Sequence, residues 1–246
     1  MSKTIILIPS RLSATRLPNK PLLKINGLSI IQHVYNRAKE SGVGKVYVAT
    51  GDKKIAEDIK KVNGKCIITK KNHKTGTDRI FEAYKKIRNK FNCEYIINLQ
   101  GDEPFINPKD IVNLNSKVKS KNSDIGTLAS KITKNYFSDK SIVKVVTEES
   151  VIDKKVSKAK NFFRDFNLKK NKNIYAHIGI YQYKTSILEK FVNFKQSKKE
   201  IRNGLEQLRA IENGINIDVV YTKNKSFGID TLQDYVEIKK IMEYKI

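Results

Sequence analysis

The chain has 246 residues and a formal net charge of +24, with 39% apolar and 30% charged residues. This composition is that of a globular protein and excludes a disordered one, and the length suits one large α/β domain. No apolar run approaches the ~20 residues of a membrane-spanning helix, and no cleavage-site pattern follows the apolar stretch Ile5–Ile8. We therefore expect a cytoplasmic protein without membrane insertion.

The first half of the chain alternates apolar strands with amphipathic helices. The pattern predicts, in chain order, strand 4–8, helix 29–41, strand 45–49, helix 52–62, strand 65–68, helix 77–91, strand 95–99 and helix 108–119. Such alternation is typical of a parallel sheet covered on both faces. Ligands bind beyond the carboxyl ends of these strands, so the residues that follow each strand are the candidates for chemistry.

The second half of the chain is less regular. It predicts strands 125–132, 143–146, 175–183 and 217–221, and helices 199–213 and 231–244. No domain boundary stands out. We therefore expect a single domain over 1–246 with an inserted antiparallel lobe around 131–185.

The loop after the first predicted strand is rich in cations. Arg11, Arg16 and Lys20 lie within ten residues, and Pro9, Pro18 and Pro21 stiffen the loop that contains them. Arginine grips phosphate oxygens with two parallel hydrogen bonds and lysine acts as a mobile point charge, so the set suits a triphosphate. A solvated basic loop is the alternative, and the Gly-x4-Gly-Lys pattern of a Walker loop is missing.

Two carboxylates follow later strands. Asp102 follows strand 95–99, where carboxylate oxygen suits Mg²⁺ beside a nucleotide phosphate, and Gly101 permits close backbone approach. Asp230 follows strand 217–221 and a short loop. A plain turn at Asp102 and a helix cap at Asp230 or Thr231 are the alternatives.

The loop before helix 77–91 contains Thr75, Gly76 and Thr77, whose hydroxyls and free backbone suit contact with a base or ribose. Capping by Thr77, with Asp78 favoured by the helix dipole, is compatible with that role. The excess of lysines favours anionic small substrates. The lysines form no aromatic-interleaved stripe, so we expect no nucleic-acid partner.

Taken in order, these segments resemble one family, the CMP-Kdo synthetases (3-deoxy-manno-octulosonate cytidylyltransferases), from about residue 4 to 240. The matching motifs are Ile8-Pro-Ser-Arg11, Thr15-Arg-Leu-Pro18 with Lys20-Pro-Leu, His73-x-Thr-Gly-Thr-Asp-Arg79, Asn98-Leu-Gln-Gly-Asp-Glu-Pro104, His177-Ile-Gly-Ile-Tyr181, Leu205-Glu-Gln-Leu-Arg209 and Gly228-Ile-Asp-Thr231. Each motif alone is modest, whereas the ordered set is specific.

The resemblance implies a three-layer α/β/α nucleotide-diphospho-sugar transferase-like (Rossmann-like) fold with a mostly parallel sheet and a smaller antiparallel lobe. It implies a homodimer that uses CTP, Mg²⁺ and an acidic 3-deoxy sugar, Kdo, to make CMP-Kdo and pyrophosphate for a cell-surface glycan, lipopolysaccharide or capsule. The lobe around 131–185 would serve dimerisation or the sugar pocket.

The resemblance also implies residue roles. Arg11, Lys20 and Asp102 match catalytic positions, and Asp102 and Asp230 match the metal ligands. The positions that match nucleotide-binding residues are Arg11, Arg16, Lys20, Thr75, Gly76, Thr77 and Asp102. The positions that match sugar-binding residues are Gln100, Arg164, His177, Tyr181, Glu206 and Gln207.

The chain departs from the family pattern over 159–166, where Phe163 replaces a serine, an Ile-Pro pair is missing and Arg164 stands in for the family's arginine. The exact sugar acid therefore stays open at this point. The alternatives are a cytidylyltransferase for a sialic-acid-like nonulosonate and a non-catalytic basic protein that binds nucleic acid.

Overall fold

The structure is a computed structural model that describes residues 3–13, 16–133, 137, 139–164, 173–226 and 228–244. The chain forms two compact units. The first combines Met1–Val112 with Ser226–Ile246, and the second is the continuous stretch Asn113–Lys225. The predicted lobe around 131–185 falls inside the second unit. None of the helices in the described ranges combines the length and the apolar character that crossing a bilayer requires.

The first unit is built on four parallel strands in the order β5-β4-β1-β6. Their bounds are β1 Thr4–Ser10, β4 Lys45–Thr50, β5 Cys66–Ile68 and β6 Tyr95–Leu99. Every residue of β1 and β6 is buried. A strand that is apolar on both faces needs cover on both, which helices supply in a parallel sheet.

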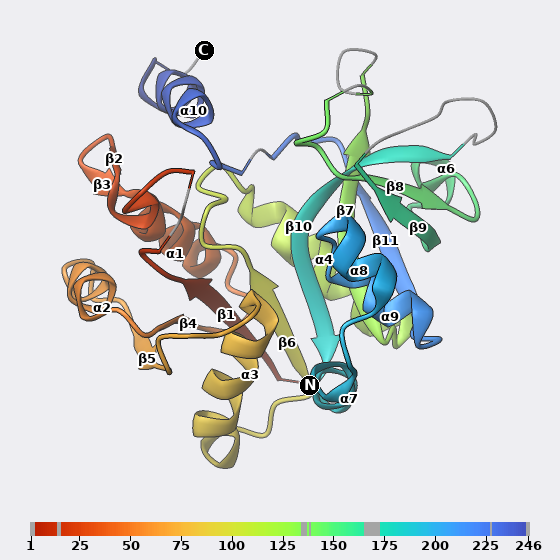
Figure 1. Cartoon of the computed structure of the whole chain (residues 1–246), viewed down its shortest axis with the longest axis horizontal. Coiled ribbons are helices and arrows are strands. Elements are labelled where there is room, and N and C mark those ends of the chain that lie inside the picture. The colour runs from red at the N-terminus through yellow and green to blue at the C-terminus, as the bar shows by residue number, and fades with distance from the viewer. Residues whose placement is uncertain are drawn as a thin grey trace. The chain divides into compact units, whose positions relative to one another are not determined.

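Two helices of the first unit, α1 Ile30–Glu40 and α3 Gly76–Ile87, begin at side-chain caps. The other α-helices of this unit are α2 Lys53–Lys60 and α10 Leu232–Tyr244 (Figure 1). Two 3-10 helices, η1 Lys20–Leu22 and η2 Arg88–Lys90, accompany them. The boundary between the units falls within α4, Pro108–Lys121. Ser29 caps α1 through a reciprocal bond with Gln32, and Thr75 caps α3 in the same way with Asp78. Such capping boxes satisfy two backbone N–H groups that the first helical turn leaves unpaired.

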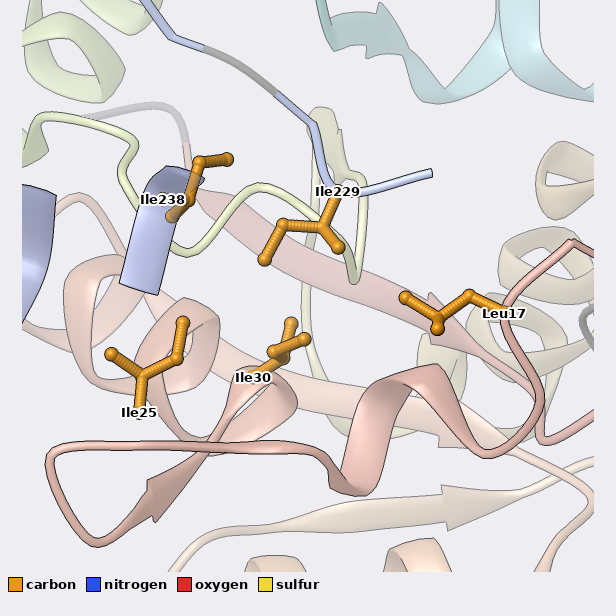
Figure 2. Close-up of a cluster of buried hydrophobic side chains, with 5 residues drawn as sticks. All are labelled: Leu17, Ile25, Ile30, Ile229 and Ile238. Carbon is orange, nitrogen blue, oxygen red and sulfur yellow. The ribbon is translucent and has the colours of Figure 1, made fainter. Parts of the chain in front are cut away.

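A small apolar cluster joins the two stretches of chain that make up the first unit. It contains Leu17, Ile25, Ile30, Ile229 and Ile238, all at most 8% exposed (Figure 2). Ile25 lies in the hairpin formed by β2 (Lys24–Ile25) and β3 (Leu28–Ser29). The cluster therefore packs the loop after β1 against the segment before α10, and the neighbours of Leu17 and Ile229 in sequence are Arg16 and Asp230.

In the part of the second unit that the structure describes, five strands form a mixed sheet. Its strands are β7 Ile125–Lys131, β8 Lys144–Thr147, β9 Val156–Phe163, β10 Ile174–Lys184 and β11 Ile217–Thr222. They pair in the order β10-β7-β11-β9-β8, and β8 also pairs with β10, so the pairings form a closed ring. Only β7 and β11 run parallel. The helices are α6 Val151–Lys154, α7 Thr185–Asn193, α8 Lys198–Asn203 and α9 Gln207–Glu212.

The predicted α/β class is confirmed, with three local corrections. The predicted helix 199–213 is two helices, because Gly204 adopts a left-handed φ of 61° after α8. Strand β9 was not predicted, because its lysines interrupt the apolar pattern that signals a strand. The cap of α3 is Thr75 and not Thr77.

Candidate active site

A polar pocket of about 320 Å³ opens beside the carboxyl ends of β1 and β6 in the first unit. It is lined by Pro9, Ser10, Arg11, Arg16, Lys20, Pro21, His73, Lys74, Thr75, Gly76, Arg79, Gln100, Gly101, Asp102 and Asp230. The lining thus comes from the end of β1 and the chain that follows it as far as η1, from the loop after β5 and the first turn of α3, from the loop after β6, and from the segment before α10. This is the edge at which parallel sheets bind ligands.

The loop after β1 brings its cations to this pocket. The backbone N–H of Leu12 donates to Oδ2 of Asp52 at 3.0 Å, which ties the start of the loop to the start of α2. Further along, Asn19 adopts a left-handed φ of 56° and Pro21 occupies the first turn of η1. Lys20 is therefore presented from a short, rigid turn, with a side chain only 12% exposed.

Two aspartates that lie far apart in the sequence converge on the ammonium group of Lys20. Its Nζ lies 2.7 Å from Oδ2 of Asp102 and 3.2 Å from Oδ1 of Asp230. Arg16 adds a guanidinium nitrogen 3.1 Å from Oδ2 of Asp230. Burial alone would lower the pKa of Lys20, but the two carboxylates outweigh it and the pKa is raised. A cation thus already occupies the point between the carboxylates.

Backbone and side-chain bonds hold the two carboxylate segments together. The N–H of Ile229 donates to the carbonyl of Asp102 at 2.9 Å, and the hydroxyl of Ser226 donates to Oε2 of Glu103 at 2.5 Å. Burial raises the pKa of Glu103 to about 7, and the nearby carboxylates of Asp102 and Asp230 add to this effect. Glu103 is a structural partner of the pocket that sequence reasoning missed, since its donor lies 123 residues away.

The start of α3 forms another wall of the pocket. Thr75 and Gly76 line it, and a Cβ on Gly76 would lie 3.3 Å from Cγ of Pro9. Thr77 does not line it. Its side chain is buried and accepts a hydrogen bond from Asn98 at 3.3 Å.

Three further residues of the pocket belong to the motif around residues 73–79 but were not singled out from the sequence: His73, Lys74 and Arg79. Nε2 of His73 lies 2.7 Å from Oε2 of Glu82. The guanidinium of Arg79 donates to the carbonyls of Lys70 and Lys71, and burial lowers its pKa. The sequence feature that could have identified them as pocket residues is their place within that motif, at the start of a predicted helix.

The pocket could hold a metal ion through two carboxylate oxygens, one from Asp102 and one from Asp230, which lie far apart in the sequence and close together in space. Within the described residues, no group of three or more His, Cys, Asp or Glu side chains forms a ligand set. Hard cations such as Mg²⁺ bind through one or two carboxylates and complete their shell with water and substrate phosphates. The Lys20 ammonium between Asp102 and Asp230 shows that both oxygens can face one cation, so the pair fits such an ion.

The predicted sugar-binding residues, other than Gln100, lie in the second unit. The rings of His177 and Tyr181, both on β10, have centroids 5.3 Å apart. Glu206 and Gln207 stand at the start of α9. Arg164 donates from its guanidinium to the carbonyls of residues 140 and 141 at 3.1 and 3.0 Å. The last two residues of the departing stretch 159–166 lie outside the described residues.

Comparison with known proteins gives a consistent result. A family model described as "Cytidylyltransferase" matches residues 5–218. A 3-deoxy-manno-octulosonate cytidylyltransferase from Thermodesulfovibrio yellowstonii is 42% identical over 97% of this chain and 98% of its own. A protein of the same name from Bartonella tribocorum is 38% identical over 97% of this chain and 98% of its own.

Solved structures are similar as well. A CMP:2-keto-3-deoxy-manno-octonic acid synthetase complexed with CTP superposes with a TM-score of 0.89 at 35% identity, and covers 100% of both chains. A UDP-glucose pyrophosphorylase complexed with UDP-glucose gives a TM-score of 0.71 at 17% identity over 100% of both chains, a likeness that shows the fold alone.

Proposed function

Because the chain belongs to the 3-deoxy-manno-octulosonate cytidylyltransferase family, we propose that it transfers CMP from CTP to the anomeric hydroxyl of Kdo and releases pyrophosphate. The chain is thus an enzyme, a nucleotidyltransferase that uses CTP and Kdo. The observation that carries the chemistry is the convergence of Asp102 and Asp230 on Lys20 in a pocket lined by further cations.

The nucleotide is assigned to the pocket of the first unit. Arg11, Arg16 and Lys20 would bind the triphosphate, because three cations that line one pocket match its charge. Thr75 and Gly76 would contact the cytidine through short hydrogen bonds. Thr77 would support these two residues indirectly. It does not line the pocket, and its buried hydroxyl is bonded to Asn98.

The metal ion that we assign to Asp102 and Asp230 is a divalent cation, and we propose Mg²⁺. Carboxylate oxygens and substrate phosphates are the ligands that this ion prefers. When bound, it neutralises charge on the phosphates and lowers the pKa of a coordinated hydroxyl. Lys20, which bridges the same carboxylates here, would then be available to the phosphates.

The sugar is assigned to Gln100 and to five residues of the second unit: Arg164, His177, Tyr181, Glu206 and Gln207. Their types suit a polyhydroxylated acid, because they offer amide, imidazole, phenol, carboxylate and guanidinium groups for hydroxyls and a carboxylate. The departure over 159–166 makes a close 3-deoxy-ulosonic acid an alternative substrate, and a sialic-acid-like nonulosonate a more distant one.

The transfer is a single displacement. The anomeric oxygen of the sugar forms a bond to the α-phosphorus of CTP as the bond to the pyrophosphate oxygen breaks, and the hydroxyl proton is released to solvent. Arg11 and Lys20 would stabilise the negative charge that develops on the leaving pyrophosphate. No covalent intermediate on the protein is required.

The remaining parts of the proposal follow from the family. We propose that the enzyme works as a homodimer in the cytoplasm, and that its product supplies a transferase that builds a cell-surface glycan. No nucleic-acid partner is needed to account for the basic pocket, because a triphosphate and a sugar carboxylate are anionic themselves.

The test is a coupled assay of pyrophosphate release with CTP, Mg²⁺ and a panel of sugar acids that includes Kdo and a nonulosonate. We expect Kdo to be turned over fastest. We expect Asp102→Asn to keep the fold and to lose turnover roughly a hundredfold or more, since a metal ligand contributes several kcal/mol to the transition state. The exposed Asp153→Asn is the matched control. Near-normal turnover by Asp102→Asn, or no release with any sugar acid, would sink the assignment.

A further inference from the structure

An irregularity in β10 places a buried hydroxyl of the neighbouring strand β7 against three polar groups of β10. β10 pairs with β7 antiparallel, and the register jumps from Ile178 opposite Leu128 to Tyr181 opposite Thr127. Gly179 and Ile180 are therefore extra residues on β10. Such bulges bend a strand and redirect its side chains, and they are common next to active sites.

The hydroxyl of Thr127 is completely buried inside this bulge. Its Oγ1 lies 2.7 Å from the carbonyl oxygen of Ile180, 3.3 Å from that of Ile178 and 3.0 Å from Nε2 of His177. A hydroxyl has one proton to donate, and carbonyl oxygens only accept. The proton of Thr127 therefore goes to a carbonyl, and its oxygen must accept a proton from the third partner.

The imidazole of His177 is that third partner, so its proton is on Nε2. The ring packs edge-on against Phe162, with centroids 5.2 Å apart, and beside the ring of Tyr181. Burial lowers the pKa of His177 to about 3, and the charge of Arg164 acts in the same direction. The ring is thus neutral near pH 7, with a hydrogen on Nε2 and a lone pair on Nδ1.

The other ring nitrogen is not completely buried. Within the described residues, Nδ1 of His177 has no hydrogen-bond partner, and it is not among the fully buried unpaired atoms. The side chain as a whole is half-buried. A neutral imidazole that is fixed in this way offers a ligand one acceptor and no positive charge.

We propose that Thr127 is a positioning residue that fixes His177 as the Nε2–H tautomer, so that Nδ1 accepts a hydrogen bond from a hydroxyl group of the sugar. The inference rests on the proposed function, because it takes His177 as a sugar contact. It follows that the imidazole of His177 selects for a hydroxyl donor and does not itself bind the carboxylate of the sugar, which has no proton to donate.

The tautomer is measured directly by two-dimensional NMR of the ¹⁵N-histidine-labelled protein near neutral pH. The chain has three histidines, so a His177→Asn variant assigns the signal. We expect a protonated Nε2 and an unprotonated Nδ1 in the free protein, and a shift of the Nδ1 resonance toward a hydrogen-bonded value when Kdo is added. A proton on Nδ1, or no shift at saturating Kdo, would overturn the proposal.

The role of Thr127 is tested with two variants. Thr127→Val keeps the shape and removes the hydroxyl, whereas Thr127→Ser keeps the hydroxyl. We expect the valine variant to raise KM for Kdo about tenfold, the worth of one neutral hydrogen bond, with KM for CTP unchanged, and the serine variant to behave as the wild type. Equal rises in both KM values would indicate a merely structural role and contradict the proposal.

Two further observations keep the test decisive. If Thr127→Val does not fold, a Kdo analogue that lacks one hydroxyl should show the same rise of about tenfold in KM with the wild-type enzyme, and uniform KM values across all such analogues would contradict the proposal. Failure of the proposed function would give a different result. The wild-type protein would then release no pyrophosphate with Kdo, while the NMR experiment would still report the tautomer of His177.

Discussion

At the scale of single residues, the pocket depends on positions whose surroundings admit only one residue type. Gly101 is the clearest case. A Cβ at this position would lie 2.7 Å from the carbonyl oxygen of Pro9 and 3.2 Å from Cδ1 of Ile31. Backbone cannot give way as a flexible side chain can. The loop after β6 and the end of β1, which leads into the next loop, therefore approach each other only because residue 101 is glycine.

We predict that Gly101→Ala displaces these loops. The variant should lose about 1–3 kcal/mol of folding free energy, as overpacked sites do, and should need more CTP for half-maximal rate because Arg11 and Asp102 move apart. Thermal unfolding and the KM for CTP measure the two effects. Gly228→Ala is the control for stability, since its Cβ would meet no atom nearer than 3.5 Å. Equal unfolding temperatures for the two variants would refute the steric argument.

A second residue-scale prediction concerns Glu82, which holds His73 at the pocket wall. Burial acts to raise the pKa of Glu82, but hydrogen bonds from Lys86, the Lys70 backbone and His73 outweigh it and lower the pKa from 4.5 to about 2. A carboxylate with a lowered folded-state pKa stabilises the protein above its unfolded-state pKa, and this contribution is lost as the pH falls through the folded-state value.

Glu82→Gln should therefore be less stable than the wild type at neutral pH, and the difference should shrink as the pH falls from about 4.5 to about 2. Urea unfolding across this pH range measures it. The exposed Glu57→Gln serves as the comparison. A difference that stays constant with pH would show that the lost interactions do not depend on the charge of Glu82.

At the scale of elements, the segment before α10 is held against the loop after β6. Ser226 bonds Glu103, Ile229 bonds the backbone of Asp102, and Ile229 also packs with Leu17 in the cluster of Figure 2. The backbone next to Asp230 is thus held both by the loop after β6 and by Leu17 in the chain that follows β1. These contacts and the Lys20 bridge together hold the two carboxylates close, although the carboxylates themselves repel each other.

We predict that Ser226→Ala loosens this arrangement. It removes the donor to a buried carboxyl, which costs about 1–3 kcal/mol, and it should raise the Mg²⁺ concentration for half-maximal activity while the rate at saturating Mg²⁺ changes little. Ser226→Thr retains the hydroxyl and is the matched control. If Ser226→Ala and wild type titrate identically with Mg²⁺, the contact has no part in spacing the carboxylates.

The elements of the first unit could largely be predicted from the sequence, because apolar runs, caps and post-strand loops are local signals. The cations of the first loop and Asp102 followed from their place after strands. Glu103 and Thr127 could not be found in this way, since their roles depend on partners 123 and about 50 residues away. Strand β9 and the helix break at Gly204 were not predicted for another reason. Pairing with neighbouring strands forms β9 despite its irregular apolar pattern, and a single left-handed residue ends α8 within an otherwise helical pattern.

At the scale of the whole molecule, the charge of +24 is the dominant property. Both substrates are anions, so the field of the protein should raise their encounter rate. We predict that kcat/KM for CTP falls as NaCl rises, since a Debye length near 8 Å at physiological salt shortens steadily with concentration. kcat should change little. Sucrose at equal osmolality is the control, and a kcat/KM that is independent of salt would contradict this role of the charge.

The first unit is assembled from two stretches of chain, Met1–Val112 and Ser226–Ile246. During translation, the whole second unit is synthesised before Asp230 is added. A nascent chain that stalls before residue 226 exposes Leu17, Ile25 and Ile30, which are normally covered by Ile229 and Ile238, and such a surface invites chaperones or aggregation. The carboxylate pair, and with it the capacity to act on CTP, is therefore acquired only after the second unit has been synthesised.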